Sequence, residues 1–245
     1  MFYFEKINNK SILKTDFIQV AHAFFTTREA VMKSKEPETV EIVEQNKHDV
    51  ASYLNVNLRN FVSPTQTHSA NIQEAKEGIL DYPDTDGLIL TNPKLAIYLN
   101  FADCTPLIFY DEFQNIGAVS HAGWRGTAQK IGVKTVERMI NHYGSAAENI
   151  KVVIGPAISL CCYDVGEEVL NKLSETVKNF DGLSEMHDGK IFVDLKGINK
   201  RQLNEVGVGK IEVCPYCTVC DNGYFYSYRK ENGTSNRHSA VLKLR

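Results

Sequence analysis

Three short clusters along the chain each contain one residue that commonly binds transition metals. The candidate ligands are His68 in the run Gln-Thr-His, Cys104 in the run Ala-Asp-Cys, and His121 in the run Ser-His-Ala-Gly-Trp-Arg-Gly. A catalytic zinc ion takes three protein ligands when its fourth position stays open, whereas a structural zinc ion is closed by four. The ligand types and their number therefore indicate a zinc-dependent enzyme.

The expected strands give two of these ligands a reason to meet. Cys104 stands at the turn before an apolar strand, and His121 ends the next strand, so one hairpin would bring both to the same region. Each residue also has an ordinary interpretation: a loop histidine is usually solvated, and a single buried cysteine usually acts as a small hydrophobic side chain. The residues alone leave a metal site and these alternatives equally open.

Charged residues near His121 suggest an anion site. Arg125 precedes a helix expected to begin near Thr127, and a helix N-terminus with a neighbouring arginine favours phosphate. The alternative is that Arg125 only caps the sheet or pairs with Asp103. Trp124 is the only tryptophan, and it suits either stacking on a planar ligand or the core.

The composition is that of an ordinary soluble protein, with 245 residues, 43% hydrophobic and 23% charged. The net charge of −3 argues against non-specific binding to nucleic acid, which needs a basic surface. We find no secretory signal and no transmembrane segment, so we expect a cytoplasmic protein whose six cysteines stay reduced. Without a linker or an internal repeat, residues 1–245 are expected to form one domain.

Apolar runs predict an α/β fold with mixed sheets flanked by helices. Strands are expected at 88–90, 95–99, 107–110, 116–119, 151–154, 191–193, 211–213 and 224–228. Helices are expected at 127–143 with Gly144 as its stop, at 164–177 with Asp164 as N-cap and Glu167 at N3, and at 196–206. Consecutive strands in the middle of the chain suggest antiparallel hairpins.

The remaining cysteines offer a possible second metal site. Cys214, Cys217 and Cys220 follow a C-x-x-C-x-x-C spacing, and Cys161 and Cys162 are adjacent. C-x-x-C is a known zinc and redox spacing. No fourth ligand with a defined spacing follows, so free thiols are the favoured interpretation, and a second metal site stays the alternative.

The sequence resembles the YfiH-like, laccase-domain family, also called multicopper polyphenol oxidase-like and now regarded as purine nucleoside phosphorylases. The motifs that carry the resemblance span most of the chain: residues 25–28, 66–68, 85–88, 102–106, 121–127, 154–158, 161–166 and 225–229. The ordered His, Cys and His motifs are specific to this family. Two segments depart from its pattern: Asn46-Lys47 stands where relatives tend to have Asn-Arg, and the tail reads Thr-Ser-Asn-Arg237 rather than Thr-Gly-Arg.

The resemblance implies a fold of layered mixed sheets and a zinc site made by His68, Cys104 and His121. It also implies phosphorolysis of adenosine, inosine, guanosine and S-methyl-5′-thioadenosine, together with deamination of adenosine, so that the partners are a purine nucleoside and phosphate. Arg125 and Lys47 are our candidates for orienting phosphate, and Asp103 for handling a proton. Copper is expected to bind such a site in vitro, because it outcompetes zinc at many sites.

The family's older label of laccase does not suit this chain. True multicopper oxidases use more histidines than the seven present here, often as His-x-His pairs, and no such pair occurs. Two other interpretations stay open. One is a metal-free cysteine hydrolase with Cys104 as nucleophile and His121 as its base; the other is a non-catalytic metal-binding protein.

Overall fold

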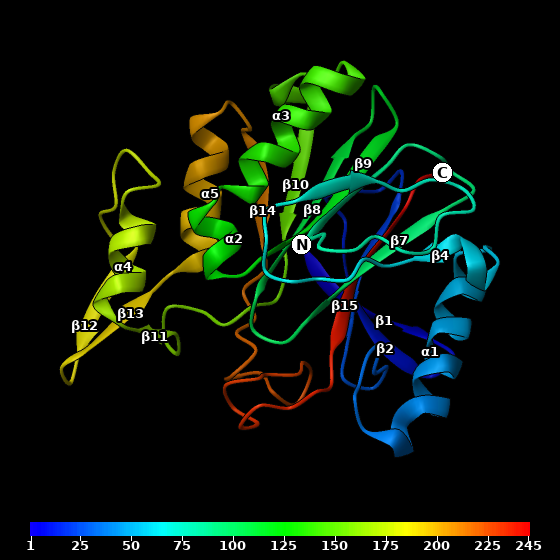
Figure 1. Ribbon diagram of the computed structural model, residues 1–245, viewed down its shortest axis with the longest axis horizontal. Helices are drawn as coiled ribbons and strands as arrows, with labels where there is room; N and C mark the ends of the chain where they lie inside the picture. Colours follow the sequence, from blue (N-terminus) through cyan, green and yellow to red (C-terminus); the bar gives the residue numbers. More distant parts are fainter.

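Two mixed sheets of six strands each form the centre of the computed structural model, which describes residues 1–245 (Figure 1). The first sheet has the order β1-β2-β3-β15-β7-β4, and only β4 and β7 run parallel. Its strands, in that order, span Phe2–Ile7, Lys10–Thr15, His22–Thr26, His238–Lys243, Ala96–Phe101 and Phe61–Val62.

The second sheet has the order β14-β10-β8-β9-β6-β5. Its outermost pairs are parallel and its inner pairs antiparallel. The strands span Lys210–Val213, Ile150–Ile154, Thr105–Asp111, Ile116–Ala122, Gly87–Leu90 and Ile72–Glu74. A small third sheet, β11-β13-β12, contains Asp164–Val165, Lys190–Val193 and Ser184–His187.

Helices cover the outer faces of the two large sheets, which gives four layers (Figure 1). Helix α1 packs on the first sheet, and α3 and α5 pack on the second. The helices span Val40–Tyr53 (α1), Trp124–Ala128 (α2), Ile131–Tyr143 (α3), Glu167–Ser174 (α4) and Leu195–Glu205 (α5), with short 3-10 turns at Pro37–Thr39, Leu58–Asn60 and Ala147–Asn149. None of these helices has both the length and the apolar character that crossing a membrane would require.

Alternation along the strands divides the core into layers. In β8, Ile108 and Tyr110 pack between the two sheets, whereas Leu107 and Phe109 pack against the helices. Because successive side chains point to opposite faces, a strand covered on both sides reads as a continuous apolar run. This is why the central strands were recognisable from the sequence, and the expected class of layered mixed sheets is confirmed.

The predicted hairpin of β8 and β9 is confirmed, with Pro106 opposite His121. The strand before it behaves differently: β7 joins the first sheet, where it pairs with β15 from the end of the chain. Such a long-range pairing leaves no local mark in the sequence. The first three strands, to which the sequence pattern assigns no element, are joined locally: β1 and β2 form a hairpin closed by Asn8 and Asn9, both with positive φ.

Three predicted elements differ from the structure. The helix predicted at 127–143 begins earlier, at Trp124, and is divided where Lys130 adopts a left-handed φ of 58°. Its predicted end is confirmed, since Gly144 has a φ of 73° and its N–H bonds to the Ile140 carbonyl. The two helices also pack on different clusters: Trp124 and Ala128 of α2 contact the small cluster around Leu173, whereas α3 packs on the second sheet.

The prediction of a helix from Asp164 with Asp164 as N-cap is wrong. Asp164 pairs with Phe192 in the third sheet, and its carboxylate binds Arg229. Helix α4 begins at Glu167 instead, after Gly166, which has no side chain to cap it. Sheet pairing and an ion pair thus outweighed the local capping pattern.

The strand predicted at 224–228 is also wrong, because these residues form turns. Their backbone groups bond locally or to another loop: Phe225 N–H donates to the Asp221 carbonyl, and the Tyr224 carbonyl accepts from Arg28 N–H. No neighbouring strand pairs with the segment, so its β-prone aromatic residues are used for packing instead.

Candidate metal centre

The three predicted ligands lie together at one end of the second sheet. Hairpin register places His121 opposite Pro106, so Cys104, two residues earlier, reaches the same edge. His68 arrives on the loop between β4 and β5. The ligand atoms of all three residues lie within 4.8 Å of one another.

A glycine allows this close approach. A Cβ atom at Gly123 would lie 2.9 Å from Cys104 Sγ and 3.2 Å from His68 Cδ2. Both distances are shorter than a comfortable van der Waals contact, so any larger residue would push the ligands apart. The glycine after His121 is therefore part of the site's geometry.

Asp86 connects the two sides of this centre, although sequence reasoning gave it no role. Its carboxylate is fully buried and accepts from His121 Nδ1 at 2.8 Å. It also accepts from the backbone N–H of three consecutive residues in the His68 loop: Thr67 at 3.1 Å, His68 at 3.1 Å and Ser69 at 2.7 Å. One side chain therefore fixes one ligand directly and the loop of another.

The hydrogen bond to Asp86 selects the tautomer of His121. A carboxylate accepts the Nδ1 proton, which leaves Nε2 with a free lone pair directed to the other ligands. Ring nitrogens that bind metals are commonly backed by a carboxylate in this way. In the sequence, Asp86 is recognisable only as a charged residue directly before the apolar strand β6. Its contact with His121 follows from the pairing of β6 with β9.

Charges within the centre favour a thiolate. Burial raises the pKa of Cys104. The charge and hydrogen bonds of His121 and His68 have the larger, opposite effect and lower this pKa to about 6. Burial lowers the pKa of His121, and the Cys104 thiolate and Asp86 raise it to about 9. The hydrogen bonds and charge of His121 also hold the pKa of Asp86 at about 2 against the effect of its burial. Without a metal, Cys104 and His121 form a thiolate–imidazolium pair near neutral pH.

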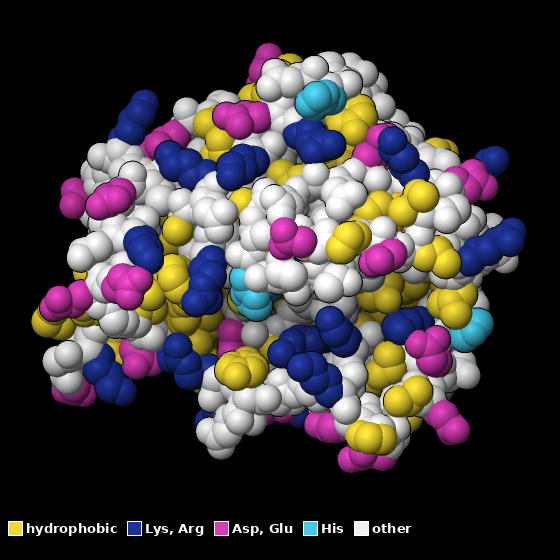
Figure 2. Space-filling model, viewed as in Figure 1, with side chains coloured by type: hydrophobic (Ala, Val, Ile, Leu, Met, Phe, Trp, Pro, Cys, Tyr) yellow, Lys and Arg dark blue, Asp and Glu magenta, His cyan; other side chains and the backbone are white.

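A cavity of about 640 Å³ opens beside the three ligands. This volume is in the range of small-molecule sites. Figure 2 shows a hollow near the middle of the face in view, with a histidine in its wall and Lys or Arg side chains on both sides. Four cations line the cavity, and sequence reasoning named none of them for this role: Lys33, Lys35, Arg229 and Arg237.

Lys33 is the cation of this group that other positive charges affect most clearly. Burial of part of its side chain, together with Arg237, Lys35 and Lys47, lowers its pKa. Several cations gathered around Lys33 create a local positive potential, which attracts anions. These residues come from the segment after β3 and the loop before β15, which only the tertiary fold brings together through the backbone pair of Lys33 and Arg237.

The three residues predicted to assist catalysis lie at different places. Asp103 lines the cavity, but its carboxylate accepts from Thr218 Oγ1 at 2.6 Å and from Arg229 N–H at 2.7 Å. Arg125 is exposed on α2 and stacks on Trp124, with its guanidinium carbon 4.4 Å from the ring centroid. Lys47 lies on α1 in a neighbouring cavity and pairs with Glu44 at 2.7 Å. Only Asp103 shares the cavity of the metal ligands.

Comparison with known proteins supports the sequence resemblance. The profile of the family described as multi-copper polyphenol oxidoreductase laccase matches residues 23–245. The chain is 30% identical over 247 residues to a purine nucleoside phosphorylase of Deinococcus radiodurans, covering 95% of this chain and 92% of the relative. It is 32% identical over 201 residues to the adenosine deaminase RL5 from an unknown prokaryotic organism, covering 77% and 76%.

The fold agrees with these relatives. A crystal structure of the hypothetical protein YfiH from Bacillus licheniformis superposes with a TM-score of 0.90, at 30% identity, and the match covers 99% of both chains. The fold and the centre are those of a layered mixed-sheet protein with a candidate metal site at one sheet edge. This chain belongs to the multi-copper polyphenol oxidoreductase laccase family.

We predict that Asp86→Asn weakens zinc binding by about 10- to 100-fold. An asparagine must either present its NH₂ group to His121, which blocks Nε2 by reversing the tautomer, or turn it toward the N–H donors of the His68 loop. Competition with a chromogenic zinc chelator measures the change in affinity.

Asp111→Asn is the matched control. Asp111 is also fully buried, but it lies at the opposite end of β8 and accepts from the backbone of Phe113 and Gln114. If both variants bind zinc equally well, at comparable thermal stability, Asp86 does not position the ligands.

The thiolate–imidazolium pair predicts the pH dependence of alkylation in the metal-free protein. A thiol whose pKa is lowered to about 6 is a thiolate above that pH, so the rate of Cys104 carboxamidomethylation is expected to rise through pH 6. Mass spectrometry of the labelled peptide follows this rate. Cys214, whose pKa burial raises to about 12, is the internal control that stays unlabelled.

In the His121→Ala variant the midpoint for Cys104 is expected to move upward, since the main charge that lowers its pKa is gone. A wild-type midpoint near the ordinary thiol value of 9.0 would contradict the ion pair.

Proposed function

We propose that this chain is a zinc-dependent purine nucleoside phosphorylase of the cytoplasm that also deaminates adenosine. Its substrates in this proposal are adenosine, inosine, guanosine and S-methyl-5′-thioadenosine. The observation that carries the proposal is the group His68, Cys104 and His121, backed by buried Asp86 and opening into a cation-lined cavity. The names of the relatives supply the substrate class.

The donor set suits zinc. Two imidazoles and one thiolate match the borderline character of Zn²⁺, and three ligands leave the fourth position toward the cavity. When bound, zinc supplies Lewis-acid chemistry, by which it activates water or polarises an atom of the substrate. Copper is expected to bind the same donors in vitro, because affinities for divalent metals generally favour copper over zinc.

For phosphate, the cations that line the cavity are the stronger candidates. Lys33 and Lys35 have no carboxylate partner within salt-bridge distance, whereas Lys47 is paired with Glu44. Lys47 contributes at longer range, because its charge lowers the pKa of Lys33. Arg125 does not line the cavity and stacks on Trp124 instead.

Other lining residues suit the nucleoside. Tyr163 and Tyr228 offer aromatic faces for a purine, and stacking on such faces is tolerant of base identity. Asp103 adjoins Cys104 and holds its carboxylate toward Thr218 and Arg229. We assign Asp103 the handling of a proton at the reacting nucleoside, with its two donors keeping the carboxylate in place.

Product analysis tests the proposal. Zinc-loaded protein is incubated with adenosine or inosine, with and without phosphate, and the products are separated by chromatography. Adenine or hypoxanthine together with ribose 1-phosphate, formed only with phosphate, shows phosphorolysis; inosine formed from adenosine shows deamination. We expect His68→Ala to lose both stoichiometric zinc and turnover, and failure of the zinc-loaded wild type to form any of these products would reject the function.

A second prediction concerns phosphate. Lys33→Ala is expected to raise the KM for phosphate about tenfold, because a charge-assisted hydrogen bond is lost. Arg125→Ala and Lys47→Ala are expected to raise it less, since neither residue lines the cavity. Adenosine deamination, which uses no phosphate, is the control within each variant. If the KM for phosphate rises more in Arg125→Ala or Lys47→Ala than in Lys33→Ala, those residues bind phosphate and Lys33 does not.

The thiolate–imidazolium pair favours one rival, a metal-free cysteine hydrolase. In that case Cys104 attacks the substrate, His121 acts as general base, and His68 has no required role. Metal analysis of protein purified without chelators separates the two functions. Stoichiometric zinc that disappears in His68→Ala supports the phosphorylase, and full activity without metal supports the hydrolase.

A further inference from the structure

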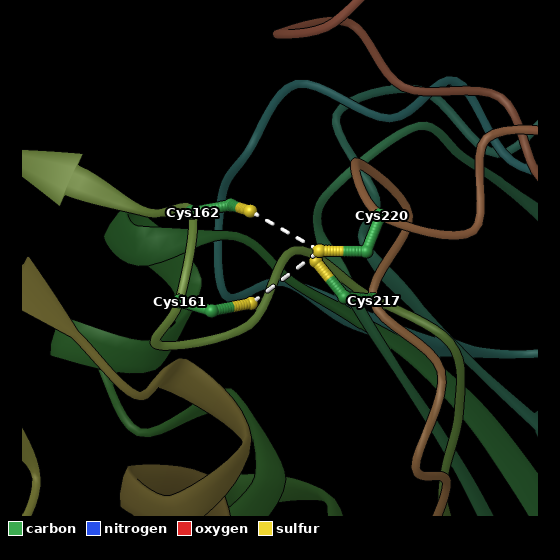
Figure 3. A group of neighbouring side chains, drawn as sticks. All are labelled: Cys161, Cys162, Cys217 and Cys220. Carbon is green, nitrogen blue, oxygen red and sulfur yellow. Dashed lines mark hydrogen bonds between the residues drawn. The ribbon is translucent and has the colours of Figure 1, made fainter.

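A second cluster of metal-ligand types lies outside the cavity described above. Cys161 and Cys162 from the connection between β10 and β11 face Cys217 and Cys220 from the connection between β14 and β15 (Figure 3). All four sulfur atoms lie within 4.8 Å of one another. Cys214, the remaining cysteine of the C-x-x-C-x-x-C run, is buried in the core and takes no part.

The distances fit a tetrahedral metal rather than a disulfide. Cys162 Sγ lies 3.5 Å from Cys220 Sγ, and Cys161 Sγ lies 3.7 Å from it. With a Zn–S bond of about 2.3 Å, the edge of a regular tetrahedron of sulfurs is about 3.8 Å. A disulfide needs an S–S distance of about 2.05 Å, and all four cysteines are free.

The sheet brings the two pairs together. Strands β10 and β14 are parallel neighbours, with Ile154 opposite Val213, so the chain leaves both strands at the same edge. The two connections stay in contact beyond that edge, since Ala157 pairs with Cys217 and Thr218 N–H donates to the Ala157 carbonyl at 3.2 Å. Because β10 and β14 are parallel, Cys161 and Cys162 reach Cys217 and Cys220 and supply the two further ligands that the C-x-x-C spacing alone lacks.

Each pair is also held in a tight turn. Cys162 N–H and Tyr163 N–H both donate to the Ser159 carbonyl, at 2.9 and 3.0 Å. Around the other pair, Asp221 N–H donates to the Cys217 carbonyl at 2.7 Å, and Cys217 N–H donates back to the Asp221 carboxylate at 2.8 Å. The two turns that carry the four thiols are therefore stabilised by hydrogen bonds at Cys162 and Cys217.

We propose that Cys161, Cys162, Cys217 and Cys220 bind a structural zinc ion. Four thiolates close the coordination shell, which is the pattern of structural zinc and leaves no open position for substrate. This site follows from the positions of the four thiols and does not rest on the function proposed for the cavity.

The metal joins two loops that shape the catalytic cavity. Tyr163 directly follows Cys162, and Thr218 lies between Cys217 and Cys220, where its hydroxyl donates to Asp103. Asp103 in turn adjoins the catalytic ligand Cys104. Zinc bound to the four thiolates thus acts as a positioning element for Asp103, at a distance from the reacting atoms.

Metal content tests the proposal on protein purified from medium containing zinc, without chelators. We expect two zinc ions per wild-type chain, and one in Cys220→Ala. Cys214→Ala is the matched control from the same cysteine run and is expected to keep two. His68→Ala is expected to lose only the catalytic ion, which distinguishes failure of this proposal from failure of the proposed function.

X-ray absorption at the zinc edge tests the same site without substituting a cysteine, so the result does not depend on whether the cysteine variants fold. In the His68→Ala protein, the remaining zinc is expected to show four sulfur neighbours at about 2.3 Å and no nitrogen. A wild-type protein with one zinc ion that Cys220→Ala retains would overturn the proposal. Iron in place of zinc, or a disulfide found by mass spectrometry among the four cysteines, would overturn it as well.

Discussion

The buried carboxylate of Asp86 is the interaction on which the candidate metal centre depends. It accepts from His121 on one side and from the backbone of the His68 loop on the other, so two chain segments distant in sequence share one anchor. A buried charge is costly unless its bonds are satisfied, and here every neighbour is a donor. The same bonds that hold the carboxylate ionised therefore make the positions of two ligands interdependent.

Much of the centre was predictable because its ligands sit at marked places in the sequence. Cys104 and His121 flank a hairpin whose two apolar runs are separated by a polar turn, and this local pattern was enough to bring them together. Asp86 was missed because its role follows from the pairing of β6 with β9, which is not consecutive with it. The lining cations Lys33 and Arg237 were missed for the same reason, since a long-range backbone pair joins their segments.

Errors in the predicted elements have a common physical origin. At Asp164, and along 224–228, the local sequence favours one conformation while partners elsewhere favour another. Sheet pairing, an ion pair with Arg229 and a bond to Arg28 decide these segments. Local helix and strand propensities predict such segments poorly, because contacts with residues elsewhere in the fold determine their conformation. The four clustered thiols show the same limit, because Cys161 and Cys220 become neighbours only through the parallel strands β10 and β14.

The layered packing of β9 has a consequence for how this family can vary. Val119 faces the core between the sheets, Ala118 and Ala122 face the helices, and His121 lies on the side of Val119, where its ring contacts Phe101. Since side chains alternate, the insertion of a single residue among residues 116–119 would turn His121 into the helical layer and bring Ser120, which has no imidazole, to its place. Length changes are thus tolerable in the turn at 112–115 but not within the strand, because the alternation of side chains along β9 determines which face of the sheet His121 lies on.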